Sequence, residues 1–205
     1  MARMRSRDTG SAGFSIPELL AVVAVLGGLW LIGGLAVARD PHARVRVAAH
    51  ELVLALRVAR ARAITLDRTV YVDFAPRPLT PADGVYTAFA DLDDDHTEGP
   101  GERDAAQVLL DGFRSRRVVK ELPRGIRFGA PGVSEGPGGT TVFPDGISFS
   151  GGSDKVAFYP RGNAGAGTVY LHAGDAAQVV WAVRTNLSGT IESWSLEGGQ
   201  WRRRS

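Results

Sequence analysis

The segment DLDDDHTEGPGE, residues 91–102, holds the side chains of this sequence best suited to bind a metal ion. The carboxylates at positions 1, 3, 5 and 12 of the calcium-loop pattern D-x-[DN]-x-[DN]-G-x5-E are Asp91, Asp93, Asp95 and Glu102. Oxygen ligands that converge within a dozen residues suit a hard cation that takes about six to eight of them. His96 stands at the sixth position, where the sharp turn favours glycine, and no helices are expected to flank the loop. The segment is therefore either a calcium site or a plain acidic hairpin tip.

No catalytic pattern stands out in the sequence. The four histidines show neither H-E-x-x-H nor another close metal-ligand spacing, and neither a G-x-S-x-G motif nor a phosphate-binding glycine loop is present. The absence of cysteine excludes a disulfide scaffold, a thiolate zinc site and a cysteine nucleophile. We therefore expect a protein that is not an enzyme and requires no cofactor, with calcium as the one candidate ligand ion.

Length and composition describe the body that must position these residues. The 205 residues, 44% of them hydrophobic and 22% charged, suffice for one compact domain with a short appendage. Twenty-six glycines and eleven prolines predict many turns, and hence a β-rich body rather than a helical bundle. The formal net charge of +2 comes from residues 1–13, which hold three arginines and one aspartate. The rest of the chain therefore offers no long-range basic field to attract a polyanion.

An uncharged stretch of twenty residues, 19–38, lies near the amino terminus. A helix of this length crosses the hydrocarbon core of a bilayer, about 30 Å, and the arginines before it predict a cytoplasmic amino end and a body on the other side. The A-x-A sequence of residues 36–38 favours the alternative of a cleaved secretory signal, although the stretch exceeds the usual apolar length of about 7–15 residues. Glu18 stands at the edge of the stretch, where a carboxylate either serves a function or simply stays in the headgroup layer.

The string GFSIPELL, residues 13–20, resembles the prepilin signal of type IV pilins and type II secretion pseudopilins. In that family a short basic leader ends in glycine, phenylalanine follows, and glutamate stands at the fifth mature position; Gly13, Phe14 and Glu18 match these places. The resemblance implies that a prepilin peptidase removes residues 1–13 on the cytoplasmic face and that Phe14 is then N-methylated. A plain anchored periplasmic domain is the alternative, in which processing never exposes Phe14.

The same resemblance implies a specific role for Glu18. Residues 14–41 would form a helix that is held in the inner membrane and later packs in the core of a filament. Glu18 would meet the amino terminus of a neighbouring subunit and set the register between helices, because a buried carboxylate is tolerable only with a partner. Pro17 replaces the commoner aliphatic residue, but proline costs little in the first turn of a helix.

A second helical pattern follows Pro41 and predicts an amphipathic helix over residues 42–67 that packs on a sheet. Apolar side chains spaced alternately four and three residues apart form one stripe: Val45, Ala49, Leu52, Leu56, Ala59, Ala63 and Leu66. Most arginines of the segment lie off the stripe, where we expect a solvated face: Arg44, Arg46, Arg57, Arg60 and Arg62.

Beyond Asp67 the hydrophobic period becomes two, so residues 69–205 are predicted to be rich in short strands. The predicted strands are 69–74, 85–90, 107–113, 117–121, 126–128, 140–143, 147–149, 155–159, 168–172, 178–184 and 190–196. Residues 129–139, rich in glycine and proline, are predicted to be a loop. The expected fold is α+β and pilin-like, with one long amino-terminal helix packed on a head, residues 42–205, rich in antiparallel sheet.

Two stretches of the head, ELVLALRVARARAI leading into TVYVDF and FYPRGNAGAGTVYL, resemble the type II secretion pseudopilin H / FimT branch of the pilin superfamily. The matching features are an AR-x-x-AI helix end before the first strand and the aromatic turn of residues 158–162. The resemblance implies a minor pseudopilin, a single-pass inner-membrane protein with a periplasmic head. Such a subunit joins other pseudopilins near the tip of a periplasmic filament and contributes to protein secretion, with secreted cargo as a further partner.

The alternative within this branch is a FimT-like minor pilin that acts in pilus assembly or DNA uptake. FimT-type subunits that take up DNA carry Gly-Arg-x-Arg near the carboxyl end, whereas the corresponding GTIE stretch, residues 189–192, lacks both arginines. The tail WRRR supplies the candidate DNA-binding residues Arg202, Arg203 and Arg204. An aromatic beside basic groups can stack on bases and neutralise phosphates, but a frayed, solvated terminus is the commoner arrangement.

Overall fold

The computed structural model describes residues 16–17, 19–26, 40–75, 84–97, 119–150, 152–174 and 176–204. The chain divides into two compact units, residues 1–40 and residues 41–205. In the first unit, residues 16–17 and 19–26 are helical, and the described residues include no helix long and apolar enough to cross a membrane. The predictions for Gly13, Phe14 and Glu18 lie outside the described residues, as do residues 27–39 of the predicted membrane helix.

The second unit opens with helix α2, Pro41–Leu66, one residue displaced from the predicted bounds. Proline suits the first helical position, where no N–H partner is needed, and the aspartate before it is a favoured N-cap type. At the other end Asp67 has a left-handed φ of +53°, and the N–H of Arg68 donates to the carbonyl of Ala63 at 3.3 Å. This is the Schellman arrangement, with aspartate in the place where glycine is usual, and it stops the helix before the first strand.

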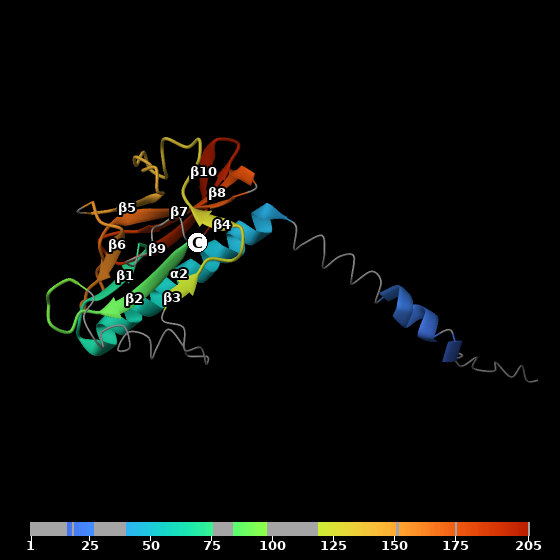
Figure 1. Cartoon of the computed structure of the whole chain (residues 1–205), viewed down its shortest axis with the longest axis horizontal. Coiled ribbons are helices and arrows are strands. Elements are labelled where there is room, and N and C mark those ends of the chain that lie inside the picture. Colours follow the sequence, from blue (N-terminus) through green and yellow to red (C-terminus); the bar gives the residue numbers. More distant parts are fainter. Residues whose placement is uncertain are drawn as a thin grey trace, which may run out of the picture. The chain divides into compact units, whose positions relative to one another are not determined.

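Two sheets form the rest of this unit (Figure 1). The first has the order β3-β2-β1-β6, with strands β1 (Val70–Asp73), β2 (Val85–Ala90), β3 (Val119–Glu121) and β6 (Lys155–Phe158). The second has the order β10-β9-β8-β7-β4, with β5 also paired to β7; its strands are β4 (Ile126–Phe128), β5 (Ile147–Phe149), β7 (Gly167–Ala173), β8 (Ala176–Thr185), β9 (Ile191–Glu197) and β10 (Gln200–Arg203). All strand pairs among the described residues are antiparallel. The predicted α+β fold is therefore confirmed.

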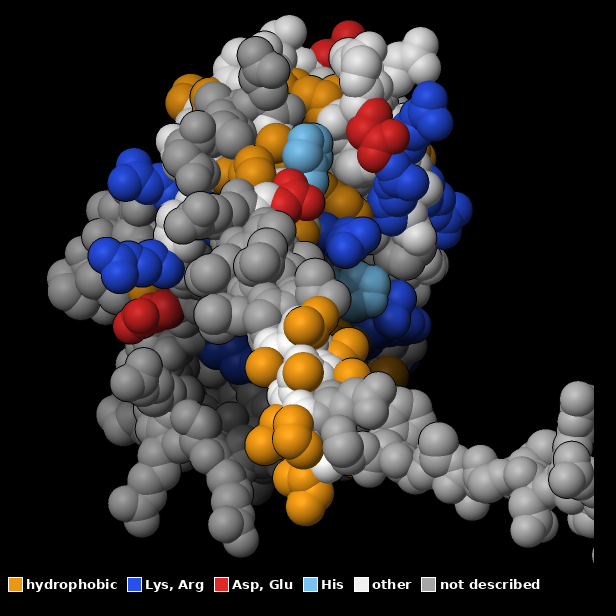
Figure 2. Space-filling view, turned by 90° about the vertical axis from the view of Figure 1, so that its right-hand side faces the viewer, with side chains coloured by type: hydrophobic (Ala, Val, Ile, Leu, Met, Phe, Trp, Pro, Cys, Tyr) orange, Lys and Arg blue, Asp and Glu red, His pale blue; other side chains and the backbone are white. Residues whose placement is uncertain are grey.

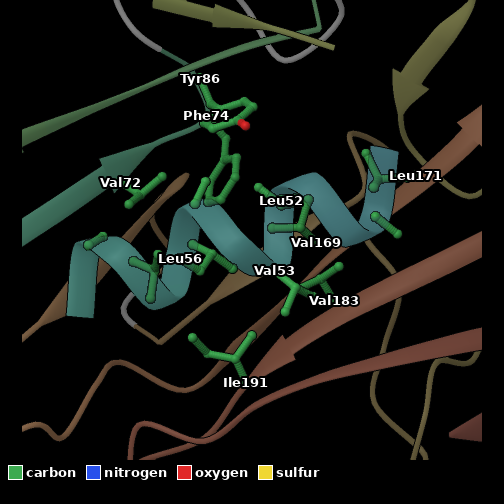
Figure 3. Packing of buried hydrophobic residues seen from close by; sticks show 14 of the residues in the cluster. Leu52, Val53, Leu56, Val72, Phe74, Tyr86, Val169, Leu171, Val183 and Ile191 are labelled. Carbon is green, nitrogen blue, oxygen red and sulfur yellow. The ribbon is translucent and has the colours of Figure 1, made fainter. Parts of the chain in front are cut away.

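The apolar stripe of α2 packs against both sheets. Six of its seven residues are at most 1% exposed, and the seventh, Leu66, is partly buried against the same core. In Figure 3, Leu52 and Leu56 lie between side chains of the first sheet, such as Val72, and side chains of the second, such as Ile191. Burial of one leucine side chain contributes about 1.5–3 kcal/mol, so this stripe is the main attachment of the helix to the head.

Aromatic rings join the two sheets beside α2. Phe74, which follows β1, stacks on Phe149 of β5 with ring centroids 5.6 Å apart. The same ring meets Phe128 of β4 edge-on, also at 5.6 Å. Such pairs contribute about 0.5–1.5 kcal/mol beyond their buried area. Because the rings come from both sheets, the sheets and the helix share one core.

Most of the predicted strands are present, and two predictions need correction. A strand at 140–143 is wrong, because Thr141 forms only an isolated bridge with Glu135. The N–H of Gly136 donates to the carbonyl of Thr140 at 2.7 Å, so this segment pairs locally and does not join the sheet. Strand β10 was missed because the basic tail read as a solvated terminus. The predicted strand 107–113 lies outside the described residues.

Candidate functional site

An acidic turn, residues 91–97, follows directly after β2. Asp91 is the first residue beyond this strand, whose six residues are all buried, and its own exposure is 0%. Its N–H donates to the carbonyl of Thr69 at 2.9 Å, which extends the pairing of β2 with β1 by one step. The sheet therefore holds the Asp91 carboxyl group in the interior, while residues 92–97 are exposed.

The turn brings together three of the four predicted metal ligands. One carboxylate oxygen from each of Asp91, Asp93 and Asp95 lies within 4.8 Å of the other two. Glu102, the fourth predicted ligand, lies outside the described residues. Three carboxylates at this separation repel one another, so a positive charge that they share stabilises the arrangement.

Left-handed backbone conformations allow the carboxylates to approach. Asp94 and His96 have φ values of +61° and +62°. His96 thus adopts the conformation for which the calcium-loop pattern favours glycine, even though a residue with a Cβ adopts it only at some cost. The Asp95 carboxylate accepts hydrogen bonds from the hydroxyl and the N–H of Thr97, at 2.6 and 2.7 Å, and these bonds lower the pKa of Asp95.

His96 contacts one oxygen of Asp91, and Tyr71 contacts His96 in turn. The backbone N–H and Nδ1 of His96 lie 3.3 and 3.0 Å from Asp91 Oδ2, and the Tyr71 hydroxyl lies 3.0 Å from the same Nδ1. A proton on Nδ1 gives the carboxylate a second donor. Burial raises the pKa of Tyr71 to about 12, and the charge of Asp91 adds to the rise. The other carboxylate oxygen, Oδ1, is buried and has no hydrogen-bond partner among the described residues.

Sequence reasoning missed the part that Tyr71 takes in this turn. The period-two pattern of β1 does place Tyr71 on the face opposite Val70 and Val72. The register then pairs Tyr71 with Phe89, two residues before Asp91, and the two rings stack with centroids 5.2 Å apart. The alternation was visible in the sequence, but the pairing of β1 with β2 that places Tyr71 near the turn was not.

The candidate DNA-binding arginines lie on β10 and just after it. Gly198 and Gly199, with φ values of +56° and +78°, form the two-residue turn that pairs β10 with β9. The indole N–H of Trp201 donates to the carbonyl of Glu135 at 2.9 Å, and its ring meets that of Tyr170 at 5.8 Å. The tail is therefore a paired strand rather than a frayed end.

Glutamates of the adjacent strand β9 pair with these arginines. Arg203 lies 3.0 Å from Glu192, Arg202 lies 3.7 Å from Glu197, and Arg204 also forms an ion pair with Glu197. Glu192, the acidic residue of the GTIE stretch, is thus a partner of the basic tail. Figure 2 shows Lys and Arg side chains at the flanks of one face of the head, with acidic side chains beside them.

Arg60 of α2 joins segments that are far apart in the sequence. Its Nε donates to the carbonyl of Gly162 at 2.7 Å, and its Nη2 donates to that of Ser188 at 3.4 Å. The AR-x-x-AI helix end and the aromatic turn therefore meet at this side chain. The expected solvated face is wrong for Arg60, whose Nε bond is partly buried. Arg44 remains at the surface, where its Nη2 donates to the carbonyl of Arg124 at 2.7 Å.

An open hollow of about 390 Å³ lies beside β4 and β7. Phe128, Phe143 and His172 are among the residues that line it, and no Asp, Glu, Lys or Arg of the described residues joins them. The Nδ1 atom of His172 lies 3.1 Å from the carbonyl oxygen of Ala173. The hollow thus lacks a pair of titratable groups that could share acid and base roles.

Comparison with known proteins agrees with this architecture. The family described as Type II transport protein GspH matches residues 48–189. This chain belongs to that family. The match begins within α2 and ends at the turn before β9, so it includes Arg60 and the acidic turn but neither the amino-terminal leader nor β10. The resemblance to the pseudopilin H branch is thereby confirmed.

No curated protein matches this chain. The chain is similar to the structure of the minor pseudopilin EpsH from the Type 2 Secretion System of Vibrio cholerae, with 11% sequence identity and a TM-score of 0.45. That similarity covers 74% of this chain and 97% of the EpsH chain.

Proposed function

We propose that this protein is a minor pseudopilin of a type II secretion system, whose head joins a periplasmic filament. The observation that carries this proposal is the GspH family match over residues 48–189. The fold supports it, because a long helix attached to a sheet-rich head leaves one helix face outward. Val47 and Leu54, two turns apart on α2, are 50% and 53% exposed, and they offer apolar surface to neighbouring subunits.

The amino-terminal motif completes the proposal. A prepilin peptidase would cleave after Gly13, Phe14 would be methylated, and the apolar helix would hold the precursor in the inner membrane with its head in the periplasm. Glu18 would then set the register of the helix within the filament. The work of the protein is mechanical and recognitional: it contributes to the tip region and meets other pseudopilins or secreted cargo, without catalysis.

Processing is tested by the intact mass of the full chain, co-produced with a prepilin peptidase. We expect the wild-type protein to lose residues 1–13 and to gain one methyl group. Gly13→Val should keep the whole leader, whereas the matched variant Gly10→Val should still be cleaved. An uncut wild-type chain would instead favour the plain anchored domain.

Filament entry is tested separately with Glu18→Gln. This variant should be cleaved normally but fail to cross-link to other pseudopilins, and secretion should fall with it. Normal secretion by cleaved Glu18→Gln protein would contradict the register role of this carboxylate.

The DNA-uptake pilin is the second candidate, and it rests on Arg202, Arg203 and Arg204. Their pairing with Glu192 and Glu197 favours the secretion role, because paired arginines leave less charge for phosphates. Double-stranded DNA binding by the full chain, measured against salt, decides between the two. Binding that weakens linearly in log K against log [salt], and that is lost when all three arginines are changed to alanine, would favour DNA uptake.

A further inference from the structure

We propose that Asp91, Asp93 and Asp95 bind one calcium ion at the end of β2. This site is independent of the filament role, because it rests only on the acidic turn. The three side chains supply oxygen ligands alone, which suit a hard divalent cation. The backbone carbonyls of the turn and water would complete the ligand set.

The buried oxygen of Asp91 is the first observation that points to a ligand. Asp91 is fully buried, its Oδ2 accepts a hydrogen bond from the backbone N–H of His96 at 3.3 Å, and His96 Nδ1 lies 3.0 Å from the same oxygen. Its Oδ1 is also buried but has no donor within the described part of the chain. A buried carboxylate oxygen without a donor is costly, and a bound cation removes that cost.

The charge balance of the turn is the second observation. Within the described part of the chain, no Lys or Arg forms an ion pair with Asp91, Asp93 or Asp95. The guanidinium that reaches the turn, that of Arg68, lies 3.6 Å from Asp94, which stands outside the cluster. His96 provides a positive charge only when it is protonated. The three carboxylates therefore share one small volume, and the described residues supply no Lys or Arg to neutralise them.

The spacing of the carboxylates fits a calcium ion. Two ligands on opposite sides of one Ca²⁺ lie about 5 Å apart, since each bond is about 2.3–2.6 Å long. All three oxygens fall within 4.8 Å of one another, inside that span. The left-handed φ of His96, +62°, gives the sixth position of the calcium-loop pattern the backbone that glycine would provide. The histidine that departs from the pattern thus preserves its geometry.

The test is calorimetric titration of the full chain, stripped with a chelator, with calcium chloride alone. We expect one ion per chain. At a calcium concentration about one hundred times Kd, the melting temperature should rise by about 5–10 °C. Asp93→Asn and Asp95→Asn should each weaken calcium binding at least about tenfold, because each removes a charged ligand. The matched control is Asp94→Asn in the same turn, which should leave Kd within about twofold.

Two further arms separate the alternatives. Magnesium chloride alone should bind at least about tenfold more weakly than calcium, and equal affinities would overturn the calcium preference. His96→Gly keeps the turn and removes the imidazole, so it should still bind calcium. Loss of binding in this variant would overturn the proposal that the three carboxylates and the turn backbone are sufficient to hold the ion. Absence of binding heat and of any melting shift in the wild-type chain overturns the site, as does equal weakening by Asp93→Asn and Asp94→Asn.

Discussion

The acidic turn (residues 91–97) and the basic strand β10 with Arg204 each gather charges of one sign on a short segment beside an antiparallel strand. On β10, every arginine finds a glutamate on β9. In the turn, Asp91, Asp93 and Asp95 lie together with no fixed cation among the described residues. The difference follows from geometry, because the register of β9 and β10 places Arg202 and Arg203 diagonally across from Glu197 and Glu192. The short turn instead places side chains of the same charge beside one another. The charges of the hairpin neutralise one another without a ligand, whereas a bound cation would stabilise the turn.

The largest expected effect on stability comes from Gly189→Ala, two residues before β9. Gly189 has a φ of +77°, and a Cβ there would collide with the carbonyl oxygen of Gly162 and crowd Arg60. We expect the free energy of unfolding to fall by about 3 kcal/mol or more, measured by urea denaturation. The shift of β9 should unpair β10 and leave calcium binding by the acidic turn unchanged.

The matched control is Gly198→Ala in the turn between β9 and β10. Gly198 has a φ of +56°, but nothing lies within 4 Å of its added Cβ. Its cost should be that of the backbone alone, about 1–2 kcal/mol. Equal losses for the two variants would show that the packing against Arg60 and Gly162 does not matter.

The next largest effect is expected for Asp91→Asn, when the unfolding free energies of wild type and variant are compared with and without calcium. In a chelator the variant loses both the burial cost and the charge-assisted bonds of the carboxylate, so its unfolding free energy should stay within about 1 kcal/mol of wild type. In calcium at about one hundred times Kd, the wild-type protein should gain about 2.7 kcal/mol and the variant should gain nothing. Thermal unfolding in both buffers measures this. If wild type and Asp91→Asn differ in unfolding free energy by the same amount in calcium as in chelator, Asp91 does not bind calcium. The turn would then need a ligand no more than the hairpin does.

A smaller effect is expected when the hairpin is made to resemble the turn. The double variant Glu192→Gln and Glu197→Gln leaves Arg202, Arg203 and Arg204 without partners. Exposed ion pairs contribute at most about 1 kcal/mol, so folding should persist, while duplex DNA binding at low salt should increase. Fluorescence anisotropy against salt measures the binding. Glu51→Gln with Glu121→Gln makes the same change of net charge elsewhere, and equal binding by both doubles would assign the effect to net charge alone.

The smallest effect concerns the pH dependence of the turn. The Thr97 hydrogen bonds lower the pKa of Asp95, so they stabilise the folded state above the ordinary pKa of an aspartate, and this contribution is lost as the pH falls through the lowered value. Thr97→Val removes the hydroxyl donor and should move the pKa of Asp95 back toward its ordinary value. Carbon NMR of the Asp95 carboxyl group follows this titration. An unchanged titration midpoint would show that the hydroxyl bond does not act on Asp95.

Much of the fold could be predicted because its signals are local. The alternating four and three spacing of the α2 stripe predicts a buried helix face, and the period-two runs predict most strands. The errors arose where a partner decided the outcome. Thr140–Phe143 looks like a strand but pairs with its own neighbouring turn, and β10 becomes a strand because β9 lies beside it. Gly198-Gly199 was a hairpin signal that the basic tail obscured.

The candidate site divides in the same way. The spacing of Asp91, Asp93 and Asp95 was visible in the sequence and predicted either a site for a hard cation or a plain acidic hairpin tip. The sequence could not show that one oxygen of the buried Asp91 lacks a partner among the described residues, or that His96 contacts the other oxygen and Tyr71 contacts His96. It also could not show that His96 has the backbone conformation of a glycine. Arg60 read as a solvated arginine because its acceptors lie about a hundred residues or more away along the chain.

By itself, the sequence determined the helix of the head, the antiparallel character of its sheets and the family, because each depends on residues close together in the chain or on a pattern along much of its length. Only the tertiary structure decided which charges are paired. Arg203 meets Glu192 through strand register, and Arg60 reaches Gly162 because α2 packs on the sheets. Asp91 ends a buried strand, and among the described residues His96 is the basic side chain that lies against its carboxylate, 3.0 Å from Oδ2. Electrostatic balance depends on distances of a few ångströms, and folding alone brings distant residues that close.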